Sequence, residues 1–403
     1  MPSLKLSPEE QHAAIDEIEA VLAETLVHEH SFRSGATAID KKRWKEVKVH
    51  EGFRVYRERD PKSAQRSFMD RASSIIAPRF VSIREAPAMS TWTTDSSEED
   101  AGYVANIKDP KVPMIVATGT VEGSLEDVVF GALASDEVSW RLRAAYLKDK
   151  TTDSKILSTI IEPTEEDPYK CLCIKWFMRE IPVFLSPFVL PRDLLVMEAT
   201  GIAEDEYGER YGYYMLHEFR HPTLPDFNSR KIVRCGISHA YLCRQLRPDK
   251  VQIFSRGFVD TRGDVPQTIT VQITAETTIS AANTVETSYM KKLGWLMMRA
   301  QQRRLYEKRP PAIPRTICSC NQSKTSSLLP CQVCGESFCS RCTVHRKIVV
   351  DMTADELIER VLPFCFGCVL TAKQMSPHEV AVDTVVRPRA YLQKTVEPAD
   401  KIH

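Results

Sequence analysis

The stretch Cys331-Gln-Val-Cys-Gly-Glu-Ser-Phe-Cys-Ser-Arg-Cys342 decides the fold of the C-terminal part of the chain. It contains two Cys-x-x-Cys pairs, and a further cysteine pair lies on each side of it. Two such pairs, each on a tight turn, supply the four thiolates that a tetrahedral zinc ion prefers. The sequence therefore predicts two zinc ions, bound by Cys318, Cys320, Cys331, Cys334, Cys339, Cys342, Cys365 and Cys368.

The predicted zinc module spans residues 310–371. A module of this size cannot bury much apolar surface, so metal binding must supply most of its folding free energy. Pro310, Pro311 and Pro314 form a stiff linker at its start. We expect residues 372–403 to form a polar tail.

A long amphipathic helix is predicted at residues 279–307, directly before the linker. Its apolar residues recur every three or four positions and so form one continuous stripe. Tyrosine, tryptophan and methionine lie beside the aliphatic residues, and such side chains suit either an adaptable ligand cavity or an ordinary core. The stripe consists of Val285, Tyr289, Leu293, Leu296 and Ala300.

Strands dominate the region before this helix. Residues 268–275 give the clearest pattern, because Ile269, Val271 and Ile273 alternate with polar residues. Alternation of this kind is typical of an antiparallel sheet with one solvated face. The predicted strands are 114–121, 155–161, 170–178, 194–200, 211–219, 232–243, 251–259 and 268–275.

The N-terminal part begins with a predicted helix at residues 7–29, for which Ser7 is a suitable N-cap and Pro8 a suitable first residue. This helix and a connector make up residues 1–39. A hairpin is predicted at 44–57, and a short helix after Ser124. Residues 60–110 are weakly periodic and polar, so we expect an inserted, partly disordered loop.

These elements predict an α+β fold, in which a long C-terminal helix closes an antiparallel sheet. Residues 40–309 contain the following motifs in order: Trp44-Lys45-Glu46-Val47, Gly52, Val55-Tyr56-Arg57, Pro191-Arg192-Asp193-Leu194 and the turn from Val259-Asp260 through Gly263 to Pro266. With these motifs, the region resembles the START family of lipid-binding domains, whose helix-grip fold holds one lipid between the sheet and the last helix. The resemblance implies a hydrophobic lipid ligand.

Residues 331–342 closely resemble the FYVE zinc-finger pattern C-x-x-C-G-x-x-F-C-x-x-C. The resemblance implies a small cross-brace module with interleaved cysteine pairs. Cys318, Cys320, Cys339 and Cys342 would bind one ion, and Cys331, Cys334, Cys365 and Cys368 the other. The first pair is one residue shorter than usual, and His345 is a spare ligand if it cannot close.

The FYVE resemblance is degenerate at the site that recognises phosphatidylinositol 3-phosphate. The family has an Arg-Arg/Lys-His-His stretch before its third cysteine, whereas this chain has Ser327-Leu328-Leu329-Pro330. Binding a phosphate selectively needs several converging cationic donors. We therefore expect weak selectivity for this lipid.

Composition excludes some classes of function. The formal net charge is zero, with 54 basic and 54 acidic residues, which argues against a nucleic-acid binder.

The sequence shows no leader and no run of about 18 apolar residues, so we expect a cytoplasmic protein, peripheral on endosomal or other membranes. No G-x-S-x-G, P-loop or H-E-x-x-H motif is present.

The sequence thus predicts a non-enzymatic lipid-binding or lipid-sensing protein whose zinc module contacts a membrane or a protein. Two alternatives stay open. One is a protein–protein adaptor with a START scaffold that binds no lipid. The other is a RING-like ubiquitin ligase, although RING fingers have a shorter gap between their second and third pairs and usually include a ligand histidine.

Overall fold

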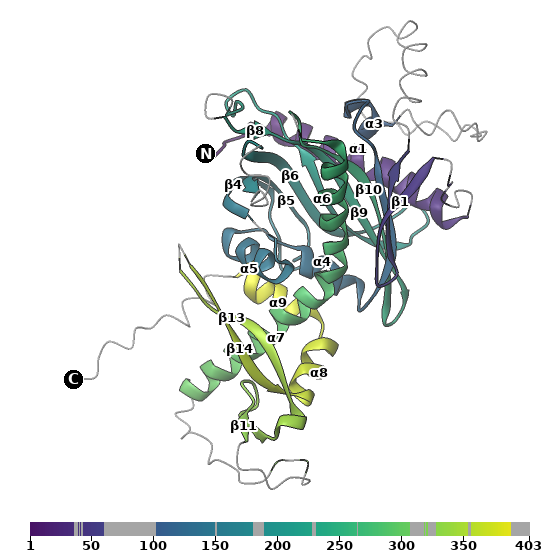
Figure 1. Ribbon diagram of the computed structural model, residues 1–403. Coiled ribbons are helices and arrows are strands. Elements are labelled where there is room, and N and C mark those ends of the chain that lie inside the picture. The colour runs from purple at the N-terminus through teal and green to yellow at the C-terminus, as the bar shows by residue number, and fades with distance from the viewer. Residues whose placement is uncertain are drawn as a thin grey trace, which may run out of the picture.

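The computed structural model describes residues 1–35, 39, 41, 43–59, 102–149, 151–179, 189–227, 231–263, 265–306, 318, 320, 328–353 and 356–387 (Figure 1). Most of the loop expected at 60–110 lies outside this part of the chain. Its end is described, and it contains a short helix, α3 (Tyr103–Ile107).

One large antiparallel sheet forms the body of the molecule. Its strand order is β1-β2-β3-β10-β9-β7-β6-β5-β4, and the short β8 pairs in parallel with β6. The strands predicted from 44 to 259 are confirmed. They are β1 (Trp44–His50), β2 (Phe53–Glu58), β3 (Ile115–Glu122), β4 (Thr151–Ile161), β5 (Cys171–Arg179), β6 (Arg192–Glu204), β7 (Arg210–Glu218), β8 (Val233–Arg234), β9 (Gly236–Arg247) and β10 (Lys250–Asp260).

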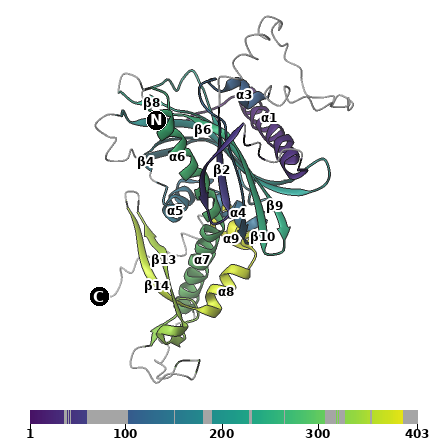
Figure 2. The same ribbon diagram turned by 45° about the vertical axis from the view of Figure 1, so that its right-hand side comes forward.

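Helices cover both faces of this sheet (Figure 2). The predicted N-terminal helix is α1 (Pro8–Arg33), and Ser7 caps it with a full capping box. It packs Ala14, Ile18 and Val21 on one face of the sheet. The opposite, inner face is covered by α6 (Gln267–Ser280), with α4 (Leu125–Ala132) and α5 (Glu137–Leu147) beside it.

The strand predicted at 268–275 is wrong, because these residues belong to α6. Val271, Ala275 and Ile279 recur every four residues and pack into the core. Thr274 and Thr278 donate hydroxyl hydrogen bonds to backbone carbonyls four residues earlier, which is compatible only with a helix. Burial of this stripe outweighs the β propensity of its threonines and isoleucines.

The predicted long helix therefore begins earlier and is divided. After α6, a 3-10 turn (Ala281–Asn283) leads into α7 (Thr284–Tyr306). The start of α7 packs so closely on α4 that a Cβ at Gly131 would lie 1.8 Å from the carbonyl oxygen of Thr284. From there α7 runs away from the sheet toward the cysteine-rich module (Figure 1).

The module packs against the middle of α7. Leu293 and Met297 of α7 are buried together with Ile348, Phe364 and the Cys365 thiol. Its elements are β11 (Leu329–Pro330), β12 (Ser337–Phe338), a 3-10 turn (Ser340–Cys342), β13 (Thr343–Met352), β14 (Leu357–Cys365) and α8 (Phe366–Gln374).

The expected polar tail from residue 372 needs correction for its described part. Helix α8 continues to Gln374, and α9 (Pro377–Ala381) and a π turn (Val382–Val386) follow. Val380 and Ala381 are fully buried against residues of α4 and α7. This segment therefore returns from the module to the body of the molecule.

Candidate functional site

The structure brings the eight predicted cysteines into two interleaved groups. In each group the four sulfur atoms lie within 4.8 Å of one another. The grouping is the cross-brace that the sequence predicts, and all these cysteines are free thiols. One group is Cys318, Cys320, Cys339 and Cys342, and the other is Cys331, Cys334, Cys365 and Cys368.

The spacing of the sulfur atoms fits a tetrahedral metal ion. A zinc ion with Zn–S bonds of about 2.3 Å separates its thiolates by roughly 3.8 Å. The Sγ atoms of Cys320 and Cys339 lie 4.0 Å apart, and those of Cys334 and Cys365 lie 3.9 Å apart. Each group can therefore hold one metal ion such as Zn²⁺.

Local turns give the thiols this arrangement. Gly335 adopts a φ of +78°, which is accessible to glycine without strain, and its N–H donates to the Cys331 carbonyl at 2.9 Å. The backbone N–H groups of Cys339 and Cys368 donate to the sulfur atoms of Cys318 and Cys365. Such N–H···S bonds stabilise thiolates over thiols.

The structure places Cys320, rather than His345, in the first group. His345 lies on β13 with an exposed side chain and belongs to neither cysteine group. Leu329 lies in the two-residue strand β11, two residues before Cys331, and its side chain is 38% exposed. This apolar position offers no donor to a phosphate.

The second candidate site is the inner face of the sheet beneath α6. Strand register places Glu198, Leu216 and His239 in one row across β6, β7 and β9. The next row contains the inward side chains of Thr200, Tyr214, Tyr241 and Ser255. We call the following buried or partly buried side chains the polar belt: Arg143, Lys175, Glu198, Tyr214, His239, Tyr241 and Ser255.

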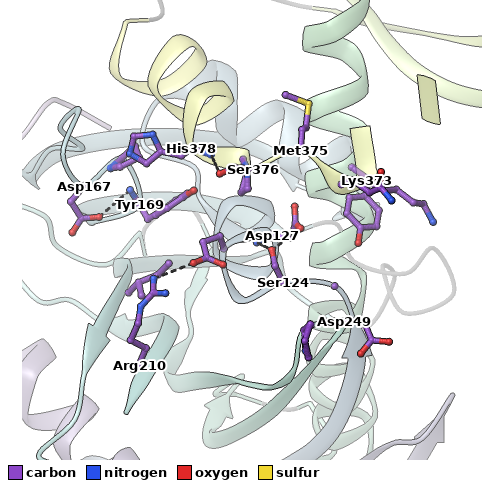
Figure 3. A pocket seen from close by; sticks show the side chains of 18 of the residues that line it. Ser124, Asp127, Asp167, Tyr169, Arg210, Asp249, Lys373, Met375, Ser376 and His378 are labelled. Carbon is purple, nitrogen blue, oxygen red and sulfur yellow. Dashed lines mark hydrogen bonds and ion pairs between the residues drawn. The ribbon is translucent and has the colours of Figure 1, made fainter. Parts of the chain in front are cut away.

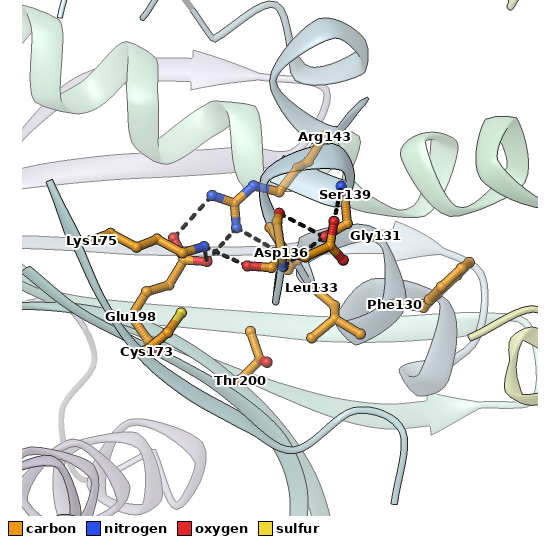
Figure 4. Close-up of polar contacts among 12 residues, drawn as sticks. Phe130, Gly131, Leu133, Asp136, Ser139, Arg143, Cys173, Lys175, Glu198 and Thr200 are labelled. Atoms are coloured by element: carbon orange, nitrogen blue, oxygen red, sulfur yellow. Dashed lines mark hydrogen bonds and ion pairs between the residues drawn. The ribbon is translucent and has the colours of Figure 1, made fainter. Parts of the chain in front are cut away.

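A charged triad forms one end of the polar belt (Figure 4). Lys175 donates to Glu198 at 2.6 Å, and Arg143 donates to both oxygens of the same carboxylate at 2.8 and 2.9 Å. Burial alone would raise the pKa of Glu198, but Arg143 and Lys175 outweigh it and lower that pKa. With two cations and one anion, the triad carries a net positive charge.

The other end of the polar belt contains buried polar atoms without partners. Within the described residues, His239 Nε2 and Ser255 Oγ make no hydrogen bond. Burial lowers the pKa of His239 to about 4, so its imidazole is neutral at physiological pH. Leaving a buried polar group unpaired costs roughly 1–3 kcal/mol, so these atoms are suited to a bound polar group.

Apolar residues surround the polar belt on both sides. Phe53, Val55 and Ile253 belong to the core beneath α6. Phe177 and Val196 belong to a second group near α5. A hydrophobic ligand with one polar end matches this distribution.

The cavity expected beneath residues 279–307 needs correction. The face of the sheet is covered by α6. At the start of α7, Val285 belongs to the core beneath α6 and Tyr289 packs against it. The rest of the apolar stripe of α7 packs on α4, α9 and the cysteine module. Trp295 lies against Phe130 and Leu133 of the α4 region, and its indole N–H donates to Asp383. Trp295, Met290 and Met297 are therefore packing residues.

Sequence analysis missed the polar belt, although two of its residues carry a signal. Lys175 is the only charge in the first seven residues of β5, and Glu198 is the only charge among the residues from Leu194 to Ala203 of β6. A charge in such an apolar strand must be paired if it is buried. The four cysteines outside the module, Cys171, Cys173, Cys235 and Cys243, are all buried.

No known protein family and no curated protein matches the sequence. Among solved structures, the chain is similar to human StAR-related lipid transfer protein 5, with 17% identity and a TM-score of 0.40, over 69% of this chain and 97% of that one. It is also similar to human STARD10, with 11% identity and a TM-score of 0.36, over 64% and 78% of the chains. A third similar structure is a STAR-related lipid transfer protein fragment from Xanthomonas axonopodis, with 13% identity and a TM-score of 0.33, over 60% of this chain and 96% of that one.

The sheet order and the helices described above define an α+β helix grip. A small cross-braced module follows it. Within the described residues, no helix combines the length and apolar character needed to cross a membrane.

Proposed function

We propose that the chain is a non-enzymatic protein that binds a lipid inside the helix grip and carries a two-zinc module for docking. The observation that carries this proposal is the polar belt. Its net positive triad and the unpartnered His239 Nε2 and Ser255 Oγ lie within an apolar interior. The ligand that fits is a lipid whose polar end accepts hydrogen bonds, such as a carboxylate, phosphate or hydroxyl.

We propose Zn²⁺ as the metal because eight thiolates in two tetrahedral groups match its preferred ligands. All eight cysteines would act as ligands, with no histidine. The START resemblance of the sequence supports lipid binding by the helix grip, and the FYVE resemblance supports zinc binding by the module.

Native mass spectrometry of the purified full-length protein tests both parts at once. We expect the mass of two zinc ions per chain and, in gentle conditions, an additional mass of one lipid. Ser255→Ala should reduce lipid occupancy without losing zinc, because it removes the hydroxyl and adds no bulk. A protein that retains zinc but captures no lipid from vesicles of mixed composition would contradict the lipid proposal.

A docking role toward a protein is the second candidate function. Phe366 and Leu370 lie one turn apart on α8 and are 59% and 53% exposed, and Val361 on β14 is 63% exposed. Apolar side chains grouped on a small module are typical of a protein contact. A scaffold that binds no lipid would leave this surface as its main means of recognition.

A further inference from the structure

A cavity of about 1010 Å³ lies outside the helix grip (Figure 3). One wall is the end of β3 and the first turn of α4, and a second wall is formed by the loop before β5 and the β6–β7 and β9–β10 turns. The third wall is residues 373–378, which comprise the end of α8 and the start of α9. The cavity is thus shared between the body and the segment that returns from the cysteine module.

The cavity is strongly acidic. Glu126 is paired with Arg210 at 3.1 Å, and Asp127 with Lys292 at 2.7 Å. Five more acidic side chains have no ion pair within the described part of the chain, against the exposed ammonium group of Lys373. These five are Glu122, Glu166, Asp167, Glu204 and Asp249.

The walls also contain an unpartnered polar group. Tyr169 is only 5% exposed, and its hydroxyl makes no hydrogen bond within the described residues. In Figure 3 its ring extends beneath Ser376 toward the middle of the cavity. The ring is held edge-on to His378, and its backbone N–H donates to Asp167. Its phenolic oxygen is thus a fixed acceptor.

Two further observations define the charge and shape of the ligand. The first-turn N–H groups of Leu125 and Asp127 already donate to Gln245 and Ser124, so they do not attract an anion. Within the described residues, no three acidic groups of this cavity lie within 4.8 Å of one another. The acidic groups are spread out, which fits several separated positive charges rather than one metal ion.

Lys373 of the protein itself shows that an ammonium group can lie against the Tyr289 ring in this cavity. The Lys373 ammonium lies 5.2 Å from the centre of the Tyr289 ring, whose other close cation is Lys292 at 4.9 Å. Aromatic faces stabilise ammonium groups in this geometry. A ligand ammonium can replace Lys373, whose side chain is exposed.

We propose that this cavity binds an extended aliphatic polyammonium ligand. One ammonium donates to the Tyr169 oxygen, and the others lie near the carboxylates of Glu166, Glu204 and Asp249. Because residues 373–378 form one wall, the bound ligand holds the returning segment against the body. This site is separate from the helix-grip interior and does not depend on lipid binding.

Isothermal titration calorimetry of the zinc-loaded full-length protein with spermine tests the proposal. We expect saturable binding with one site per chain. The double variant Glu166→Gln/Glu204→Gln should weaken binding by about five-fold or more, because it removes two charges near the ligand. The matched control Asp16→Asn/Glu19→Gln changes the net charge equally on the exposed face of α1 and should bind as the unmodified protein does.

Tyr169→Phe provides the second test. It should weaken spermine binding by several-fold while leaving the melting temperature unchanged or higher, because it removes an unpaired buried hydroxyl. A tetralysine peptide in place of spermine distinguishes a free amine from lysine side chains, and saturable binding of either supports the site. Equal affinities in the double variant and its control, or no saturable binding of either cation, would overturn the proposal.

Discussion

At the scale of single residues, Glu198 is a buried charge held by two cations. Its carboxylate joins β6 to Lys175 on β5 and to Arg143 on α5, and all three side chains are at least nine-tenths buried. Breaking a buried ion pair by removing one partner costs about 3–5 kcal/mol, because the remaining charge is left unpaired. The cost therefore depends on which member of the triad is changed.

Glu198→Gln should lower the free energy of unfolding by about 3 kcal/mol or more, because it leaves two buried cations without an anion. Lys175→Met should cost clearly less, since Arg143 still makes two hydrogen bonds to Glu198. Urea denaturation followed by circular dichroism measures both. Equal costs for the two variants would show that Arg143 and Glu198 do not form a self-sufficient pair.

The two candidate sites differ in how far single residues could reveal them. Cysteine pairs such as Cys331 and Cys334 can be recognised as metal ligands from the sequence, because close pairs of thiols have few other uses in a reducing compartment. A lysine such as Lys175 is ambiguous, since the same residue on a solvated strand face has no special meaning. Only strand register shows that Lys175 and Glu198 share the inner face.

At the scale of elements, the helix α6 shows where sequence patterns are ambiguous. Residues 268–275 alternate like a strand and also carry Val271 and Ala275 at helical spacing. Threonine and isoleucine favour the strand locally, whereas contact with β1, β2, β3 and β10 favours the helix. That contact joins residues distant in the sequence, so the local pattern does not contain it.

The contact between α4 and α7 gives a prediction about helix packing. Gly131→Ala should lower the free energy of unfolding by about 2 kcal/mol or more, because the new Cβ would meet the Thr284 carbonyl oxygen at 1.8 Å. Gly294→Ala on α7 is the matched control. Its Cβ would meet Ile348 at an ordinary 3.8 Å, and alanine favours the helix by up to about 1 kcal/mol.

Thermal melting of the two glycine variants gives the comparison directly. The melting temperature should fall for Gly131→Ala and should stay level or rise for Gly294→Ala. A stable Gly131→Ala protein would mean that α7 can move away from α4 at little cost. That result would weaken the role of this contact in fixing the direction of α7.

At the scale of the whole molecule, α7 connects two parts that are stabilised differently. The helix grip has a large apolar core beneath α6 and another beneath α1. The cysteine module has a small core, formed with Leu293, Met297, Ile348 and Phe364. We expect metal binding to supply most of the stability of the second part and little of the first.

Removing the metal with a strong chelator at neutral pH should therefore unfold the molecule only in part. Hydrogen exchange should rise sharply in β13, β14 and α8, because their cysteines lose the ion that holds them together. It should also rise in the middle of α7, whose apolar residues the module covers. The inner strands β9 and β10 should keep their protection, because no cysteine of the module contributes to their core.

The controls separate metal loss from general destabilisation. Returning zinc should restore protection in all three module elements, and Cys334→Ser should reproduce the effect without a chelator. Cys243→Ser changes a buried cysteine of the grip core and should instead loosen β9 and β10 while the module stays protected. If chelation exposed the module and the grip strands to the same extent, α7 would couple them into one cooperative unit, and the molecule would have one stability rather than two.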